Sequence, residues 1–349
     1  MQTLMEKEIF EIPQVIKNCI DYNEAAVKKI KDYLSNNKIR FILVAARGTS
    51  DHAGLFFKYL IESQCGLPVV LAAPSVSTMY NSRYQTKESM VIGLSQSGMA
   101  EDVIEIVEDA KKNGAFTIGI TNDCDSRLAV CAETHLYCNC GPEKSVAATK
   151  TFIAQMVLLT LLSGLINIDA DDQDIRDKLM IVSDEIKRIL SRKIEIYSKA
   201  ELLKNMTECF TLARGYNYAI ALESALKMQE CAYVKAKSYS TADFMHGPIA
   251  MIDEGSTCFV YANEDIFSDE LLDLAKRIKQ YGAKLVAISD DDRINHISDI
   301  VIKLEKPIAQ VMAPFYTAVV IQLFACGLSI AKGLNPDIPR NLKKVTITK

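Results

Sequence analysis

One unit of sequence occurs twice in this chain of 349 residues. The stretch DVIEIVEDAKKNGAFTIGIT (102–121) corresponds to ELLDLAKRIKQYGAKLVAIS (270–289). Each has the periodicity of an amphipathic helix that ends at a glycine and is followed by a short apolar strand. The two glycines, Gly114 and Gly282, lie about 168 residues apart. Two further pairs keep this register, namely FILVAARGTS (41–50) with CFTLARGYN (209–217) and QMVLLTLLSGLI (155–166) with AVVIQLFACGLSIAKG (318–333).

The repeat predicts the fold class. A constant offset across three features indicates two copies of one structural unit. Strand and helix alternate in each copy, so we expect α/β architecture with two doubly wound domains, each a parallel sheet flanked by helices. The expected parts are a lead-in segment at 1–25, a first domain at 26–168, a helical linker at 169–199, a second domain at 200–335 and a C-terminal tail at 336–349.

Composition excludes several classes of function. With 49% hydrophobic and 24% charged residues the chain is typical of a globular protein, and a net charge of −4 argues against nucleic acid as a partner. Ten cysteines without regular spacing indicate reduced thiols, and with four histidines we expect no metal site and no cofactor.

The N-terminus has no apolar h-region, and the apolar stretch 151–166 is shorter than a membrane span and carries three polar residues. We therefore expect 151–166 to be a buried helix, with no membrane partner and a cytoplasmic location.

Two strands of the first copy run into small polar residues at their carboxyl ends. FILVAA is followed by Arg47 and then by Gly48, Thr49 and Ser50, and MVIGL is followed by Ser95, Gln96 and Ser97. Ligands of doubly wound sheets bind at such strand ends, where helix N-termini present free N–H groups. The two loops therefore predict a phosphate site that needs no lysine or arginine. The alternative is that these hydroxyls only cap helices.

A third turn, GPEKSVAATKTF (141–152), precedes a helix that we expect to begin near Val146. Glu143 would lie just before that helix, and an acidic residue there is favourable for the helix dipole alone.

The stretch ALESALKMQE (221–230) places Glu223, Lys227 and Glu230 in one narrow stripe of a helix. Such a stripe is either a solvated face with an i,i+4 ion pair or the wall of a polar pocket. The pattern alone leaves both readings open.

Six motifs follow one another along the chain, namely GTSDHAG, LSQSG, GPEKSVAATKTF, ALESALKMQE, HGPIAMID and PRNLKK. This is the order found in the isomerase half of glucosamine-6-phosphate synthase, which the chain resembles over nearly its whole length. The segment MEKEIFEIP (5–13) also resembles the one that introduces that half. The resemblance implies two sugar isomerase (SIS) domains in tandem, each with a five-stranded parallel sheet.

The resemblance also implies roles for residues. Glu230 would be the base that moves a proton between C1 and C2, Lys227 would stabilise the oxyanion, and Glu223 would orient the lysine.

The resemblance gives further roles to residues elsewhere in the chain. His246 would open the sugar ring, and it would be supplied by the neighbouring subunit of a homodimer with shared active sites. Lys344 aligns with a lysine that forms a Schiff base. The expected substrate-binding residues of the third turn are Glu143, Ser145, Val146 and Ala148.

The sequence begins at the isomerase half, so we expect it not to be the synthase. Stand-alone relatives include glucosamine-6-phosphate deaminases and fructosamine-6-phosphate deglycases. The sequences of residues 141–150 and of the C-terminal tail resemble these relatives more closely than they resemble the synthase. Ala100, Arg47 and Lys237 replace a threonine, a cysteine and a glutamate of the synthase pattern, and they bear on which sugar is bound. The alternatives are a plain aldose–ketose phosphosugar isomerase and a non-catalytic phosphosugar-binding regulator.

Overall fold

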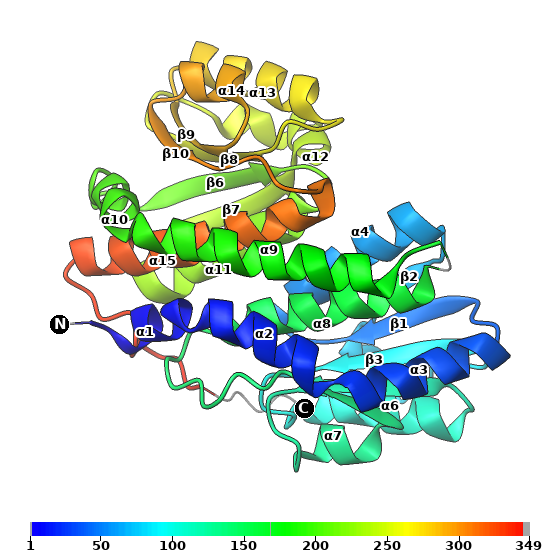
Figure 1. The fold of residues 1–349 in the computed structure, drawn as a ribbon. Coiled ribbons are helices and arrows are strands. Elements are labelled where there is room, and N and C mark those ends of the chain that lie inside the picture. The colour runs from blue at the N-terminus through cyan, green and yellow to red at the C-terminus, as the bar shows by residue number, and fades with distance from the viewer. Residues whose placement is uncertain (1, 168, 345–349) are drawn as a thin grey trace. The chain divides into compact units, whose positions relative to one another are not determined.

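The structure is a computed structural model and describes residues 2–167 and 169–344 (Figure 1). Two compact units each hold one five-stranded sheet. The unit with the first sheet comprises Glu11–Glu143, Ala148–Ser183 and the tail from Lys343. The unit with the second sheet comprises the chain up to Phe10, Lys144–Ala147 and Asp184–Leu342.

The first sheet is entirely parallel, in the strand order β2-β1-β3-β4-β5. Helices α6 and α7 pack on each other and on the sheet, α5 packs on α6, and α3, α4 and α8 also contact the strands. Figure 1 shows α3, α6 and α7 beside this sheet. The strands are β1 (Phe41–Ala45), β2 (Val69–Leu71), β3 (Ser89–Leu94), β4 (Phe116–Thr121) and β5 (Thr134–Tyr137). The helices are α2 (Ile12–Tyr22), α3 (Glu24–Asn36), α4 (Thr49–Cys65), α5 (Pro74–Thr78), α6 (Glu101–Lys112), α7 (Arg127–Cys131) and α8 (Lys150–Ile166).

The second sheet is also parallel, in the order β10-β9-β8-β6-β7. Its strands are β6 (Glu208–Ala213), β7 (Lys235–Ser240), β8 (Thr257–Ala262), β9 (Lys284–Ser289) and β10 (Ile300–Lys303). The helices of this half are α10 (Lys193–Glu201), α11 (Asn217–Ala232), α12 (Thr241–Met245), α13 (Ser268–Gln280), α14 (Asp292–Ile297) and α15 (Ala313–Ala331), with short 3-10 turns at Pro248–Met251 and Gln310–Met312. Helix α1 (Leu4–Phe10) contacts α15, and α9 (Asp172–Ser191) follows α8 in the chain.

Both sheets have the same topology. Numbered within each copy, the strand order is 2-1-3-4-5 in both. The predicted repeat and α/β fold are therefore confirmed, down to the turns at Gly114 and Gly282, whose φ angles are +80° and +81°. In this order strand 2 lies on one side of strand 1 and strand 3 lies on the other. Ligands of such sheets bind at the switch point between strands 1 and 3.

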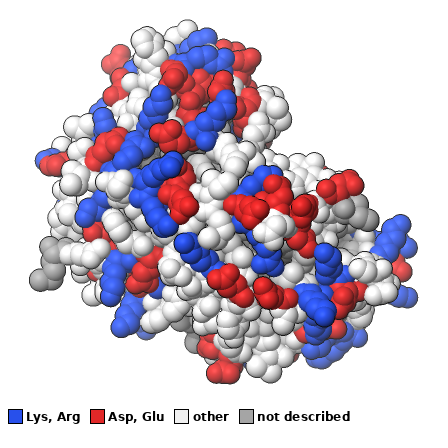
Figure 2. Space-filling view, viewed as in Figure 1, with Lys and Arg blue, Asp and Glu red and all other residues white. Residues whose placement is uncertain are grey.

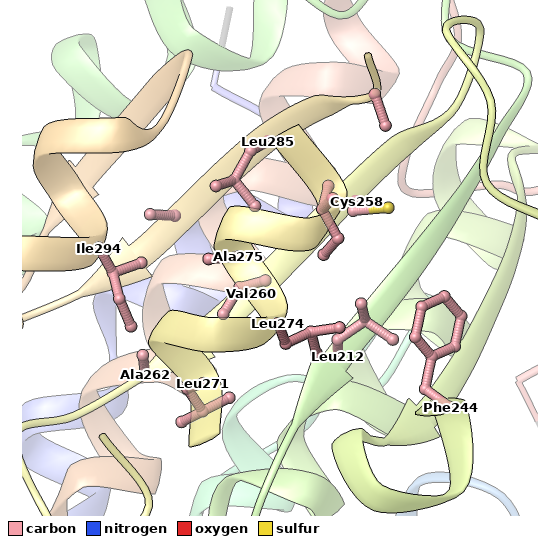
Figure 3. Close-up of a cluster of buried hydrophobic side chains, with 13 residues drawn as sticks. Leu212, Phe244, Cys258, Val260, Ala262, Leu271, Leu274, Ala275, Leu285 and Ile294 are labelled. Atoms are coloured by element: carbon pink, nitrogen blue, oxygen red, sulfur yellow. The ribbon is translucent and has the colours of Figure 1, made fainter. Parts of the chain in front are cut away.

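The hydrophobic core of each unit lies between its sheet and the flanking helices. Figure 3 shows part of the second core, where Leu271, Leu274 and Ala275 of α13 face the side chains of Val260 on β8 and Leu285 on β9. Helix α8 is buried over almost its whole length, as predicted. Helix α15 is long and apolar enough to cross a membrane, but 94% of its apolar window is buried inside the protein, as in the core helix of a soluble protein.

One predicted boundary is wrong. Helix α8 begins at Lys150 and not near Val146. The residues before it are held in an irregular segment, because Glu8 accepts hydrogen bonds from the N–H groups of Lys144 and Ser145, and the Asp337 carbonyl accepts one from Val146.

The surface carries charges of both signs. On the face drawn in Figure 2, lysine and arginine side chains are interspersed with aspartate and glutamate. All ten cysteines are free thiols.

Candidate functional site

The switch point of the first sheet brings together the two predicted phosphate loops. Strand β1 leads through Arg47 and Gly48 into α4, and the neighbouring β3 leads through Ser95–Ala100 into α6. Glycine is required at Gly98, because φ is +65° and an added Cβ would lie 2.1 Å from Ser126 Oγ. The fold therefore fixes this glycine whether or not a ligand binds.

The loop hydroxyls do not act as helix caps. The N-cap residues of α4 and α6 are Gly48 and Ala100, and neither makes a side-chain cap hydrogen bond. Ser95 Oγ accepts from Gly98 N at 3.1 Å, and Ser97 Oγ accepts from Met99 N at 3.3 Å, so both shape their own loop. Backbone carbonyls already accept from several first-turn N–H groups, since Asp51 N donates to Gly48 O in α4 and Ile104 N donates to Ala100 O in α6.

The phosphate-loop side chains differ in exposure. Ser50 and Ser95 are buried, and Ser50 Oγ accepts a hydrogen bond from Gln155 Nε2 at 3.0 Å. Thr49, Gln96 and Ser97 are partly exposed and Gly48 is exposed. A ligand at this loop cluster would therefore meet Thr49, Gln96, Ser97 and backbone amides first.

Sequence reasoning missed an ion pair between these loops. Arg47 Nε donates to Asp102 Oδ2 at 2.8 Å, and Asp102 is completely buried in the first turn of α6. The two residues lie 55 positions apart, so no local pattern pointed to the pair.

The polar stripe of α11 is buried, so its interpretation as a solvated face is wrong. Lys227 Nζ lies 2.5 Å from Glu230 Oε2 and 3.4 Å from Glu223 Oε1. The side chains of Lys227 and Glu223 are 0% exposed, whereas that of Glu230 is 22% exposed. Burial alone would lower the pKa of Lys227, but the carboxylates of Glu223 and Glu230 raise it above its ordinary value. The cluster is therefore a buried ammonium between two carboxylates, one of which reaches the surface.

Glu143 joins the start of α8 to the tail. Its carboxylate accepts hydrogen bonds from Thr149 N at 3.0 Å and Thr151 N at 3.1 Å, and Lys344 Nζ lies 2.7 Å from Oε2. Burial would raise the pKa of Glu143, but the Lys344 ammonium and these hydrogen bonds hold it below its usual range. Lys344 is thus placed beside the third turn, while the tail beyond it lies outside the described residues.

The other residues of the third turn are held through their backbone. Ser145 is completely buried, and its Oγ has no hydrogen-bond partner among the described residues. Val146 and Ala148 are half-buried. The Glu8 carboxylate, itself 4% exposed, accepts from Ser145 N at 3.2 Å. The lead-in helix α1 therefore fixes this turn.

His246 does not join the ion-pair cluster of α11. It caps the C-terminus of α12 and is exposed. Gly247 follows with a φ of +150°, which L side chains rarely adopt. Among the described residues, no group of three histidine, cysteine, aspartate or glutamate side chains could hold a metal ion.

Comparisons with known proteins match both halves of the chain. Residues 34–163 and 202–332 match the family model described as SIS domain. A glutamine–fructose-6-phosphate aminotransferase (isomerizing) from Bacteroides thetaiotaomicron is 36% identical over 361 residues, covering 98% of this chain and 58% of that protein. Its counterpart from Pyrococcus horikoshii is 35% identical over 356 residues, covering 98% and 57%. The chain thus spans less than two thirds of these relatives.

Among solved structures, the C-terminal domain of glucosamine-fructose-6-phosphate aminotransferase from Francisella tularensis has a similar fold. It matches with a TM-score of 0.88 at 26% identity, covering 97% of this chain and 98% of that domain.

Proposed function

This chain belongs to the SIS domain family, and on that premise we propose that it is an enzyme that opens the ring of a sugar phosphate and transfers a proton between C1 and C2. The proposed substrate is an amino-sugar phosphate or a fructosamine phosphate. Water hydrolyses its C–N bond, so that oxygen enters the sugar and ammonia or an amino acid leaves. Relatives named as fructose-6-phosphate aminotransferases support a phosphosugar that carries nitrogen.

The observation that carries this proposal is the buried cluster on α11. Burying the ion pair of Lys227 and Glu223 costs desolvation free energy unless its hydrogen bonds are well formed. Folding alone does not require such a buried pair. Glu230 reaches the surface from that cluster, so it can meet a substrate while its partner stays fixed. A phosphosugar sensor needs no such proton-transfer group.

In the proposed mechanism, the loops after β1 and β3 bind the phosphate through amides and hydroxyls. His246, from the partner subunit of a homodimer, would transfer the proton that opens the ring. Glu230 would take the proton from one carbon and return it to the other, while Lys227 stabilises the negative oxygen and Glu223 holds Lys227. A Schiff base at Lys344 would require its amine to leave Glu143 and lose a proton first.

The test separates the reactions by product. The pure protein is incubated with glucosamine 6-phosphate, fructose-lysine 6-phosphate and fructose 6-phosphate, and ammonia, free lysine and aldose phosphate are assayed separately. Amine release from either of the first two supports the proposal, and conversion of fructose 6-phosphate alone supports a plain isomerase. Absence of turnover with all three, with tight phosphosugar binding, would identify a regulator instead.

A further inference from the structure

The ion pair between Arg47 and Asp102 crosses the switch point of the first sheet. Arg47 follows β1, and Asp102 lies in the first turn of α6, which follows the adjacent β3. The Nε to Oδ2 distance is 2.8 Å. This pair therefore joins the two loops from which the proposed phosphate site is built.

Burial of Asp102 fixes where the guanidinium lies. The Asp102 side chain is 0% exposed, and its Oδ1 also accepts a hydrogen bond from Val103 N at 2.9 Å. A buried carboxylate of this kind needs its cation. The Arg47 side chain is 49% exposed, so its guanidinium is anchored at Nε while part of it remains accessible.

We propose that Arg47 binds the substrate phosphate directly, as a cationic arm of the switch-point loops. This inference rests on the proposed function. A guanidinium offers paired N–H groups whose spacing fits two phosphate oxygens, and such charge-assisted bonds are roughly twice as strong as neutral ones.

The second copy of the repeat supplies an internal comparison. Arg214 follows β6 as Arg47 follows β1, and it lies 3.7 Å from Glu270 in the first turn of α13. An arginine after the first strand thus pairs with a carboxylate in both copies of the repeat. The loop after β8, however, carries Asn263, Glu264 and Asp265 where the first copy has Ser95, Gln96 and Ser97.

These carboxylates make the second switch point unsuitable for a phosphate. Asp290 also lies there, accepting hydrogen bonds from Asn263 Nδ2 at 3.1 Å and Glu264 N at 2.7 Å. A dianion would meet like charge at close range. Arg214 is therefore a structural counterpart of Arg47, and it provides a matched control.

The test measures the binding of fructose 6-phosphate, inorganic phosphate and fructose to wild-type protein, Arg47→Ala and Arg214→Ala by calorimetry. Arg47→Ala should weaken both phosphate ligands about 10- to 100-fold, the loss of a charge-assisted hydrogen bond. Binding of fructose should not change. Arg214→Ala should bind all three ligands with wild-type affinity. Raising the salt concentration should reduce the difference in phosphate affinity between wild type and Arg47→Ala, because salt screens the charge of Arg47.

Two further variants guard against misfolding, because Arg47→Ala leaves Asp102 buried without this cation. Arg47→Lys keeps a positive charge but loses the paired N–H groups, so it should bind phosphate with intermediate strength. Arg47→Ala combined with Asp102→Asn removes both charges and should bind as weakly as Arg47→Ala. Thermal melting verifies the fold of each.

Some outcomes overturn the inference alone. Unchanged phosphate affinity in folded Arg47 variants would do so, as would equal losses for fructose and fructose 6-phosphate. If wild-type protein bound inorganic phosphate but no sugar phosphate, the proposed function would fail while the role of Arg47 could still be read from inorganic phosphate. If the wild type bound neither, both proposals would be wrong.

Discussion

The ammonium of Lys227 lies 2.5 Å from the carboxylate of Glu230 and 3.4 Å from that of Glu223, all on α11. Because Lys227 is fully buried, Lys227→Met should lower the free energy of unfolding by about 3–5 kcal/mol, the usual cost of leaving a buried charge unpaired. Denaturant unfolding measures it. Glu201→Gln, on the exposed end of α10, is a control that should cost little.

The same cluster predicts how stability depends on pH. The pKa of Lys227 is raised on folding, so its contribution is fully present below the unfolded pKa of about 10.4 and is lost as pH rises through the higher folded pKa. The stability difference between wild type and Lys227→Met should therefore stay constant from neutral pH to about pH 9. A difference that shrank between pH 7 and pH 9 would show that Lys227 titrates there and would contradict the assignment.

Glu143 provides an acidic counterpart. Burial opposes its ionisation, yet Lys344 and backbone N–H groups keep its pKa lowered. The stabilisation from this depressed pKa is present above the unfolded value of about 4.3 and is lost as pH falls through the lower folded pKa. Lys344→Met should raise the pKa of Glu143, as followed by NMR of the carboxyl carbon. An unchanged pKa would mean that the ion pair is not formed in solution.

Two glutamates of α1 form a matched pair for testing the third turn. Glu8 holds the N–H groups of Lys144 and Ser145, whereas Glu6 accepts from Tyr197 Oη at 2.9 Å and Lys193 Nζ at 3.1 Å. Both are buried, at 4% and 6% exposure. Glu8→Gln and Glu6→Gln should lower the melting temperature by similar amounts, because each weakens charge-assisted hydrogen bonds.

Only Glu8→Gln should speed amide hydrogen exchange in the segment 144–147, measured by mass spectrometry. If Glu6→Gln sped exchange in that segment equally, the segment would depend on the packing of α1 as a whole and not on the Glu8 carboxylate.

The proposed homodimer predicts complementation. Folded but inactive His246→Ala and Glu230→Gln proteins are mixed under conditions of subunit exchange. Random exchange makes about half of the dimers mixed, each with one complete site, so about a quarter of the wild-type activity should return. A protein carrying both substitutions, mixed with either single variant, is the control and should restore none. No recovery after verified exchange would remove His246 from a shared site.

Much of the fold was predictable because the repeat carries local signals. Helical periodicity, a terminating glycine and an apolar strand recur at one offset, and these signals follow from hydrogen bonding and burial within about 20 consecutive residues. The switch-point loops were predictable for the same reason, since each directly follows a strand.

Contacts between distant segments were not predictable. Glu8 lies 136 residues before Lys144, and Arg47 lies 55 before Asp102, so neither pairing leaves a periodic trace. The wrong start of α8 has this origin, because the amides of 144–146 are held by Glu8 and Asp337 and not by a helical turn. The sequence also did not decide whether the α11 stripe is buried, because the spacing of an i,i+4 pair is the same on a surface and in a core.

The central claim is that Glu230 transfers the proton at C2. The direct measurement is exchange of the substrate C2 proton with deuterated water, followed by NMR, because it isolates this step from ring opening and amine release. Glu230→Gln keeps the side-chain shape but cannot accept the proton, so exchange should fall by roughly 10²–10⁴-fold with substrate affinity nearly intact. Glu223→Gln should reduce exchange less, because it acts through Lys227. Exchange at the wild-type rate in Glu230→Gln would contradict the account.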